Sequence, residues 1–206
     1  MEAILDLYHL PYDPKHPVVC MDEKPYQLLD DVLVPIAMKP GSPKKIDYEY
    51  ERKGTCSIFV FLEPLTGWTH ANPRERRTAI DFAHEIKWLL TERFPNAEKV
   101  RIPLDNLNTH IPASLYKAFP AKEARELLRR IEFHYTPVHG SWLNMAEIAI
   151  SILSRQCISK RIPDMNTLKN EINAWLAVLN NFPSPVNWQF TSDDARIKLR
   201  KLYPII

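Results

Sequence analysis

The chain has 206 residues, of which 45% are hydrophobic and 25% are charged, a composition typical of one globular domain or one domain with a small appendage. No segment approaches the roughly 18 uninterrupted apolar residues of a membrane-spanning helix, and the first residues lack the basic region of a secretory signal. The net charge of +2 is too small to indicate a nucleic-acid partner by itself.

Eighteen prolines and four glycines divide the first third of the chain into short elements. Residues 1–16 are expected to form a short helix and a proline-rich lead-in. Residues 18–22 are a short apolar run typical of a buried strand. A loop over residues 35–47 is followed by residues 48–71, whose aromatic and β-branched residues predict a meander of three strands with a turn at 63–67.

The hydrophobic pattern changes to a helical period from Thr78, which is a plausible helix cap. The expected helices cover residues 78–92, 113–130, 142–158, 165–179 and 193–202, and strands are expected at 99–104 and 131–135. Antiparallel strands followed by strand–helix–strand and then helices predict an α/β fold, with a mixed sheet of about five strands flanked by helices. Pro103 within a strand predicts a bulge or an early strand end.

Three carboxylates stand at positions where acids are costly. Asp22 and Asp105 each follow an apolar run, so both are expected at carboxyl ends of strands, where open α/β sheets bind ligands. Glu147 lies in an apolar helix, and no neighbour three or four positions away can pair with it, so it needs a counter-charge from elsewhere. Taken singly, the two aspartates are also good turn or cap residues, and a lone buried glutamate more often bonds an arginine or a backbone amide.

Three carboxylates that converge in one cleft would raise one another's pKa unless cations neutralise them. Oxygen ligands suit Mg²⁺ or Mn²⁺ rather than zinc. Two such ions, about 3.5–4 Å apart, polarise a phosphodiester, activate the nucleophile and stabilise the leaving oxygen. Composition and spacing do not establish this convergence.

The blocks around the three acids resemble those of a known family. They read VCMDE at 19–23, LDNLNTH at 104–110 and HGSWLNMAE at 139–147. In this order they are similar to the acidic blocks of bacterial insertion-sequence transposases of the mariner-like superfamily, of the insertion sequence 630 type. Residues 47–55 and 75–79 also resemble that group, and the likeness covers nearly the whole chain. The ordered set of blocks is specific, whereas any single block is weak.

This resemblance implies a ribonuclease H-like fold in which Asp22, Asp105 and Glu147 are catalytic and hold two Mg²⁺ or Mn²⁺ ions. The implied reaction cuts DNA strands at the ends of a transposon and joins the freed 3′-hydroxyls to target DNA. The gap between the second and third acids is longer than is usual in the superfamily, and residues 121–130 are interpreted as an insertion.

The resemblance also divides the chain into three parts. We expect a lead-in helix at 1–16, a ribonuclease H-like catalytic domain at 17–160, and a helical extension packed on it at 161–206.

Further residues within the matched blocks are candidates for supporting roles. Asn106, His110 and Asn144 are expected to orient metal ligands or contact the scissile phosphate, although turn and cap hydrogen bonds would also explain them. Glu23 should point to the sheet face opposite Asp22 and is not counted as a ligand. Candidate DNA-binding residues, which solvated surface charge would also explain, are Lys44, Lys45, Arg76 and Arg77.

The remaining cysteine and tryptophan positions favour structural interpretations. Three distant cysteines are expected to be buried, reduced thiols of an intracellular protein. The tryptophans are expected in the core rather than as base-stacking surfaces; they are Trp68, Trp88, Trp142, Trp175 and Trp188.

The expected partner is DNA, both transposon ends and target, and a homodimer would bring two ends together. Transposases of this kind carry helix-turn-helix modules before the catalytic domain, and the first acid at position 22 leaves no room for them, so we expect that module on another chain or missing. No membrane partner is expected, and the expected location is the bacterial cytoplasm, near the nucleoid. Two alternatives stay open, a ribonuclease H-like cellular nuclease and a non-catalytic, domesticated or decayed transposase that binds DNA or protein.

Overall fold

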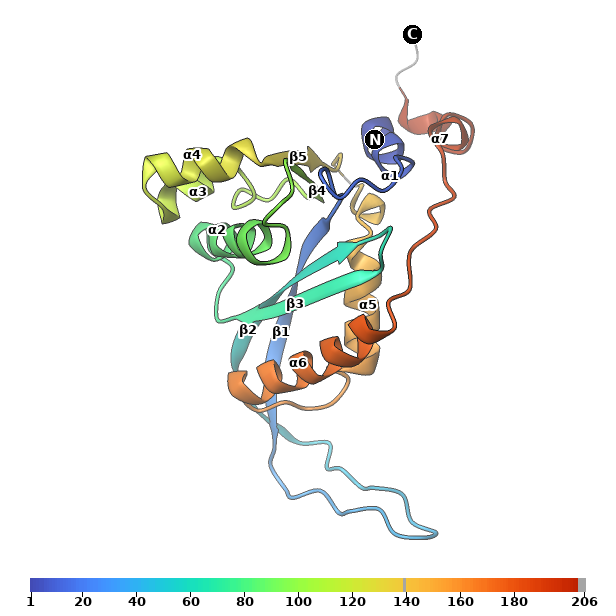
Figure 1. The fold of residues 1–206 in the computed structure, drawn as a ribbon. Helices are drawn as coiled ribbons and strands as arrows, with labels where there is room; N and C mark the ends of the chain where they lie inside the picture. The colour runs from blue at the N-terminus through green and yellow to red at the C-terminus, as the bar shows by residue number, and fades with distance from the viewer. Residues whose placement is uncertain (139, 204–206) are drawn as a thin grey trace.

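The computed structural model describes residues 1–138 and 140–203. His139, the first residue of the third acidic block, lies outside the described residues, as do residues 204–206. In the described part, the strands form one mixed sheet and the helices surround it (Figure 1).

The sheet consists of two pieces joined at one point. The strands are β1 (Cys20–Asp31), β2 (Tyr50–Glu63), β3 (Trp68–Arg74), β4 (Val100–Leu104) and β5 (Ile131–Tyr135). β1, β2 and β3 form an antiparallel meander, and β4 pairs with β5 in parallel. A parallel bridge between Val18 and Arg101 connects β1 to β4, through hydrogen bonds of 2.9 Å from the Val19 amide to the Arg101 carbonyl and from the Arg101 amide to the Pro17 carbonyl. The strand order is therefore β3-β2-β1-β4-β5.

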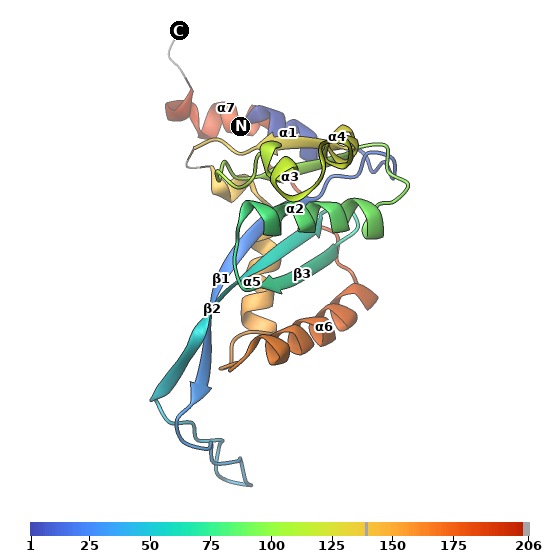
Figure 2. The same cartoon turned by 90° about the vertical axis from the view of Figure 1, so that its left-hand side faces the viewer.

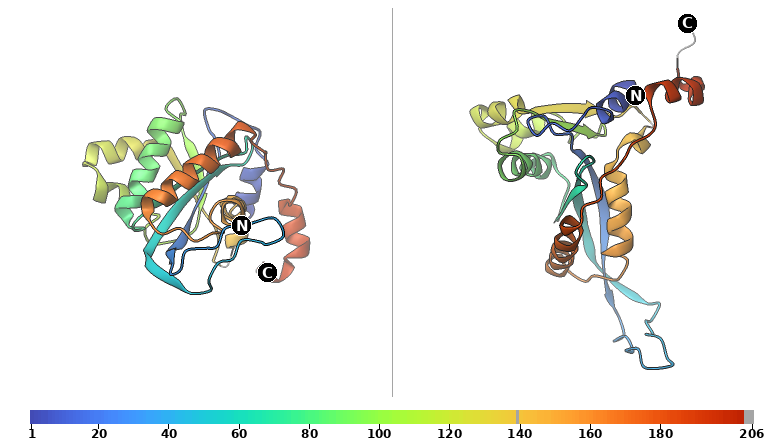
Figure 3. Two further views of the ribbon diagram at one scale, coloured as in Figure 1. Left: turned by 90° about the horizontal axis from the view of Figure 1, so that it is seen from below. Right: turned by 45° about the vertical axis from the view of Figure 1, so that its right-hand side comes forward.

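Helices cover both faces of this sheet (Figures 2 and 3). They are α1 (Glu2–Tyr8), α2 (Ala79–Trp88), continued by a π turn η1 (Leu89–Arg93), α3 (Ala113–Ala118), α4 (Ala121–Arg129), α5 (Ala146–Gln156), α6 (Met165–Asn181) and α7 (Ser192–Lys198). Short 3₁₀ turns η2 (Ser141–Leu143) and η3 (Arg200–Leu202) complete the set. No helix in this described part has the length and apolar character that crossing a bilayer requires.

The alternation of side chains along the strands separates the core into two clusters. Met21 of β1 and Val19 just before this strand pack with α2, α3 and α4, whereas Cys20 and Leu28 pack with α1, α5, α6 and α7. Successive strand residues point to opposite faces of a sheet, so one apolar strand supplies both clusters. Asp22 therefore faces α5, and Glu23 faces α2.

The β1–β2 hairpin extends beyond the body of the molecule as an arm formed by residues 32–49 (Figures 1 and 2). Isolated bridges pair Ile36 with Lys45 and Lys39 with Ser42 inside it. Arg161 fastens its base, donating to Asp31 Oδ1 at 2.7 Å and to the carbonyls of residues 47–49. The arm exposes large apolar side chains, and that of Val34 is 91% exposed.

Most of the expected elements are confirmed, and Thr78 caps α2 with a reciprocal capping box. The helix expected over residues 113–130 is divided into α3 and α4, with the extended residues Phe119 and Pro120 between them. Residues 48–50 and 56–62 are not two strands, because one strand, β2, begins at Tyr50 and runs through all of residues 56–62. The cysteines are free and buried, as expected.

Three expectations about the acidic blocks were wrong. Asp22 is the third residue of a 12-residue strand and does not end it, because β1 stays paired with β2 as far as Asp31, with one register shift between Leu28 and Leu29. The helix expected from residue 142 begins only at Ala146, after the 3₁₀ turn η2. Glu147 therefore lies in the first turn of α5 and is exposed, so it needs no buried counter-charge.

The expected bulge at Pro103 is also absent. β4 and β5 pair without a register shift through Pro103 and Leu104. Arg101 turns its amide and carbonyl toward β1, and Pro103, two residues later, faces the same edge. The missing N–H therefore removes a bond to β1 and not to β5, and the β1–β4 ladder stops there.

The division at residue 160 stays a prediction. Leu168 and Ile172 of α6 and Ala195 of α7 lie in the same buried cluster as Ala149 and Leu153 of α5. The helices after residue 160 thus share a core with the sheet.

Candidate active site

Asp22 lies on β1, opposite Val60 of β2, on the face covered by α5. Its Oδ1 atom accepts the backbone N–H of Glu23 at 2.7 Å. Burial, together with the negative charges of Asp105, Glu23 and Glu147, raises the pKa of Asp22 to about 6, against the lowering effect of the Glu23 amide. The charges of both other predicted acids therefore act on Asp22.

Asp105 follows the last residue of β4, as expected. Its Oδ1 accepts the Leu107 amide at 3.1 Å and lies 2.6 Å from His110 Nδ1. The His110 hydrogen bond lowers the pKa of Asp105; partial burial opposes this shift, while the Leu107 amide and the positive charge of Arg77 reinforce it. Asp105 is therefore held ionised.

His110 is fully buried and links two carboxylates. Its Nε2 atom lies 2.7 Å from Oε1 of Glu23, and the Glu23 side chain is 2% exposed. Ionised carboxylates only accept hydrogen bonds, so both ring nitrogens must donate, which requires the imidazolium form. Burial lowers the pKa of His110, but the hydrogen bonds and charges of Asp105 and Glu23 prevail and raise it to about 9.

Glu23 is the residue whose importance the sequence did not reveal. Strand alternation correctly placed it on the face opposite Asp22. The available signal was that an acid on the covered face of a sheet needs a buried partner. Its partner, His110, is 87 positions away, and no local pattern connects the two.

The two candidate asparagines bond the backbone. Asn106 Nδ2 donates to the Thr136 carbonyl at 2.6 Å, which ties the loop after β4 to the end of β5. Asn144 Nδ2 donates to the Met21 carbonyl at 2.8 Å, and its Oδ1 accepts the Ala146 amide at 3.1 Å. Asn144 thus fixes the start of α5 against β1, one residue before Asp22.

Glu147 opens onto a surface pocket of about 360 Å³, whose wall includes Trp142 and Arg155. Trp142 is 42% exposed, so the expectation that all the tryptophans are core residues fails for it. Phe190 packs edge-on against the indole ring, with 5.8 Å between ring centroids.

The metal-binding capacity of the acids depends on their free oxygens. Oδ2 of Asp22, Oδ2 of Asp105 and both carboxylate oxygens of Glu147 accept no hydrogen bond from residues that the structure describes. Among the same residues, no three His, Cys, Asp or Glu side chains lie close enough together to bind one metal ion. The donors suit a hard divalent cation, but their present spacing does not enclose one.

The basic candidates separate into two places. Arg76 and Arg77 are exposed in the loop between β3 and α2, and the charge of Arg77 acts on Asp105. Lys44 and Lys45 are exposed on the arm, which projects away from the loop after β4 (Figure 1).

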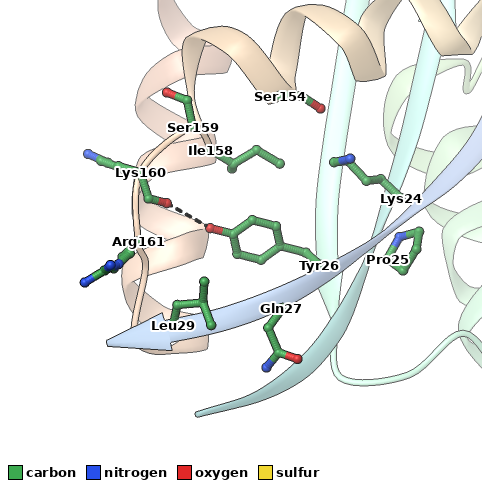
Figure 4. Close-up of a pocket in the computed structure, with 10 residues that line it drawn as sticks. All are labelled: Lys24, Pro25, Tyr26, Gln27, Leu29, Ser154, Ile158, Ser159, Lys160 and Arg161. Atoms are coloured by element: carbon green, nitrogen blue, oxygen red, sulfur yellow. Dashed lines mark hydrogen bonds between the residues drawn. The ribbon is translucent and has the colours of Figure 1, made fainter. Parts of the chain in front are cut away.

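A second pocket, of about 430 Å³, lies between β1 and the C-terminal end of α5 (Figure 4). Lys24, two residues after Asp22 and thus on the same face, lines it together with Lys160. The Tyr26 hydroxyl donates to the Lys160 carbonyl at 3.2 Å across the pocket. Lys160 itself pairs with Glu171 at 2.7 Å, so its charge is already partly neutralised.

The family model described as DDE superfamily endonuclease matches residues 17–169. Among curated protein sequences, none matches this chain.

Several solved structures share the fold. A Mos1 mariner paired-end complex with Mn superposes with a TM-score of 0.56 at 16% identity, over 86% of this chain and 52% of that chain. A Mos1 transposase paired-end complex with the left transposon end gives 0.52 at 16% identity, over 79% and 48%. A simian T-cell lymphotropic virus intasome bound to the PP2A regulatory subunit B56 gamma gives 0.53 at 14% identity, over 94% and 58%.

The chain thus spans about half of each of these solved chains. Identities this low show the fold alone, and the expected ribonuclease H-like mixed sheet with flanking helices is confirmed.

Proposed function

Because the chain belongs to the DDE superfamily of endonucleases, we propose that it is the catalytic part of a transposase, which cuts and joins DNA strands with divalent metal ions. The Mos1 complexes and the intasome contain proteins that handle DNA ends, and this proposal extends that role to the present chain.

The observation that carries the proposal is the electrostatic state of Asp22. Burial and the charges of Asp105, Glu23 and Glu147 raise its pKa to about 6, so ionising Asp22 costs more than it would in water, and a bound cation would offset that cost. We propose that Asp22, Asp105 and Glu147 hold two Mg²⁺ or Mn²⁺ ions. When bound, such ions polarise the scissile phosphodiester and activate the attacking hydroxyl.

The chain's own residues have separable roles in this proposal. Asp22 and Asp105 each have one oxygen fixed by the protein and one left for a cation. Glu147 stands on the exposed first turn of α5 and completes the ligand set when metal and DNA bind. Arg77, beside Asp105, and Arg76 contact backbone phosphates and so position the strand, which is the main protein contribution to phosphoryl transfer.

The finer features of the proposal concern the whole protein. We propose that the reaction takes place at transposon ends, followed by joining to target DNA, and that a helix-turn-helix module outside this chain recognises the ends. Lys44 and Lys45 would contact DNA from the arm. Two copies would pair through the arm, because its exposed apolar residues are left uncovered by the described residues. They include Val34, Met38 and Tyr48.

The test is nicking of supercoiled DNA in Mg²⁺ or Mn²⁺ by the wild-type chain and by Asp22→Asn, Asp105→Asn and Glu147→Gln. Removing one metal ligand is expected to lower the rate by about 10²-fold or more, because the charge at the transferring phosphate is no longer neutralised. Arg125→Gln on α4 serves as a control. Unchanged rates in all three acid variants, or cleavage restricted to RNA in RNA–DNA hybrids, would refute the proposal.

A further inference from the structure

Glu23 is a buried acid for which the proposed chemistry has no use. Its side chain is 2% exposed and lies on the sheet face opposite Asp22. Burying an acid without a hydrogen-bond partner is costly, so a buried Glu23 needs a partner within the fold. Its partner is the fully buried ring of His110, whose Nε2 lies 2.7 Å from Glu23 Oε1.

The other nitrogen of the same ring holds a proposed metal ligand. Nδ1 of His110 lies 2.6 Å from Oδ1 of Asp105, so two short hydrogen bonds run from Glu23 to Asp105. The ring itself is fixed by its surroundings. The Phe82 ring lies 4.8 Å away between centroids, and the Tyr135 hydroxyl donates to the His110 carbonyl at 2.7 Å.

This connection spans a gap in the sheet. In the described residues, the backbone hydrogen bonds between the β1 and β4 edges are those at Arg101, and Pro103 has no N–H with which to add another. Asp22 and Asp105 both lie beyond that point, on chain segments that the ladder no longer ties together. The link from Glu23 on β1 through His110 to Asp105 replaces the missing backbone connection with side chains.

The connection also selects which oxygen of Asp105 is free. Oδ1 is occupied by His110 and by the Leu107 amide, while Oδ2 accepts no hydrogen bond in the described part of the chain. The Asp105 side chain is 44% exposed, so without the ring it would rotate in solvent. Groups that orient metal ligands in this way commonly change metal affinity about 10–100-fold when they are removed.

We infer that Glu23 is a positioning residue which, through His110, sets the orientation of the Asp105 carboxylate and its place relative to Asp22. This inference rests on the proposed function, in which Asp105 is a metal ligand. Glu23 acts through the geometry of its hydrogen bond, and it does not itself contact metal or DNA.

The test compares Glu23→Ala and Glu23→Gln with a matched control, Glu85→Ala. Glu85 is a buried acid in the same layer between the sheet and α2, where it accepts from Asn72 and Arg74 and has no link to the three acids. Three quantities are measured on the full chain: Mn²⁺ affinity by calorimetry without DNA, the Mn²⁺ concentration for half-maximal nicking, and the urea midpoint.

Glu23→Ala is expected to weaken Mn²⁺ binding and to raise the half-maximal Mn²⁺ concentration by about tenfold. The nicking rate at saturating Mn²⁺ should stay within about threefold of wild type, because the metal then orders Asp105 by itself. Glu23→Gln, which keeps an oxygen acceptor for His110 Nε2, should restore most of the affinity. Glu85→Ala should lower the urea midpoint and leave the Mn²⁺ dependence unchanged.

Other outcomes separate this inference from the proposal beneath it. If Glu23→Ala does not fold, His110→Phe fills the ring volume without hydrogen bonds and should show the same tenfold shift. A wild-type Mn²⁺ dependence in whichever of these two variants folds, or a shift no larger than that of Glu85→Ala, overturns the positioning role while the proposed function stands. A wild-type chain that neither binds Mn²⁺ nor nicks DNA overturns both.

Discussion

At the scale of single residues, the site combines an acid that resists ionisation with one that ionises easily. Burial raises the pKa of Asp22 to about 6, while the His110 hydrogen bond lowers that of Asp105. Because the two shifts are opposite, Asp105 loses its proton at a lower pH than Asp22 does, and a bound cation would favour the ionised form of both carboxylates.

The raised pKa of Asp22 makes a prediction about stability without metal. Its pKa of about 6 in the folded protein exceeds the ordinary value of 3.8. The contribution of Asp22 to the free energy of unfolding is therefore fully present below pH 3.8 and is lost as pH rises through 6. Asp22→Asn removes this loss. We expect the melting temperature of Asp22→Asn to exceed that of wild type at pH 7 in chelator, with the difference shrinking toward pH 4.

Thermal melts of both proteins from pH 4 to 8 provide the measurement. Adding Mn²⁺ should raise the melting temperature of wild type and have less effect on the variant. If the wild-type protein is the more stable of the two at pH 7 in chelator, ionised Asp22 does not destabilise the folded protein, and the prediction is contradicted.

At the scale of elements, the position of Glu147 depends on how α5 begins. The helix starts at Ala146, after a 3₁₀ turn, and its N-cap residue Met145 makes no side-chain capping bond. Asn144, one residue earlier, caps the helix instead: its side chain accepts a hydrogen bond from the Ala146 amide and donates one to the Met21 carbonyl. One buried amide thus joins the strand of Asp22 to the helix of Glu147.

Asn144→Ala is therefore expected to cost about 1–3 kcal/mol, because it leaves the Met21 carbonyl and the Ala146 amide without their partner. Urea unfolding measures the loss, and hydrogen exchange should show earlier opening of the first turn of α5. The exposed Asn108→Ala provides the control and should stay within about 0.5 kcal/mol of wild type. Equal stabilities of the two variants would remove Asn144 from this role.

At the scale of the whole molecule, the chain divides into a compact body and the arm. The body encloses two apolar clusters on the two sides of one sheet. The arm is anchored by Arg161 at its base, yet it exposes a run of apolar residues beyond that anchor. Exposed apolar surface of this kind indicates a partner, and a second copy would satisfy it.

Replacing residues 32–49 by an Asn-Gly turn tests this pairing. In sedimentation experiments, the wild-type chain is expected to self-associate with a Kd on the order of 10–100 μM, a modest affinity suited to a small interface. The variant without the arm is expected to be monomeric. Lys44→Ala with Lys45→Ala removes charge but keeps the apolar surface, and should associate as wild type does. A wild-type chain that stays monomeric at about 1 mM would contradict the role of the arm.

Many of the local elements follow from the order of residues within short segments. Thr78 is recognised as a helix cap, because capping acts within a few residues. Hydrophobic alternation placed Asp105 at the end of β4 and Glu23 on the face opposite Asp22. The family likeness also came from the order of short blocks, which the match over residues 17–169 supports at the level of the superfamily.

Contacts between distant groups, in contrast, depend on how the whole chain packs. The length of β1 depends on its pairing with β2, so Asp22 lies inside a strand that its own neighbours predicted to end there. The exposure of Glu147 depends on where α5 begins against β1, and the link from Glu23 to His110 spans 87 positions. Such contacts are made by segments far apart in the chain, and a pattern with a period of two or 3.6 residues carries no information about them.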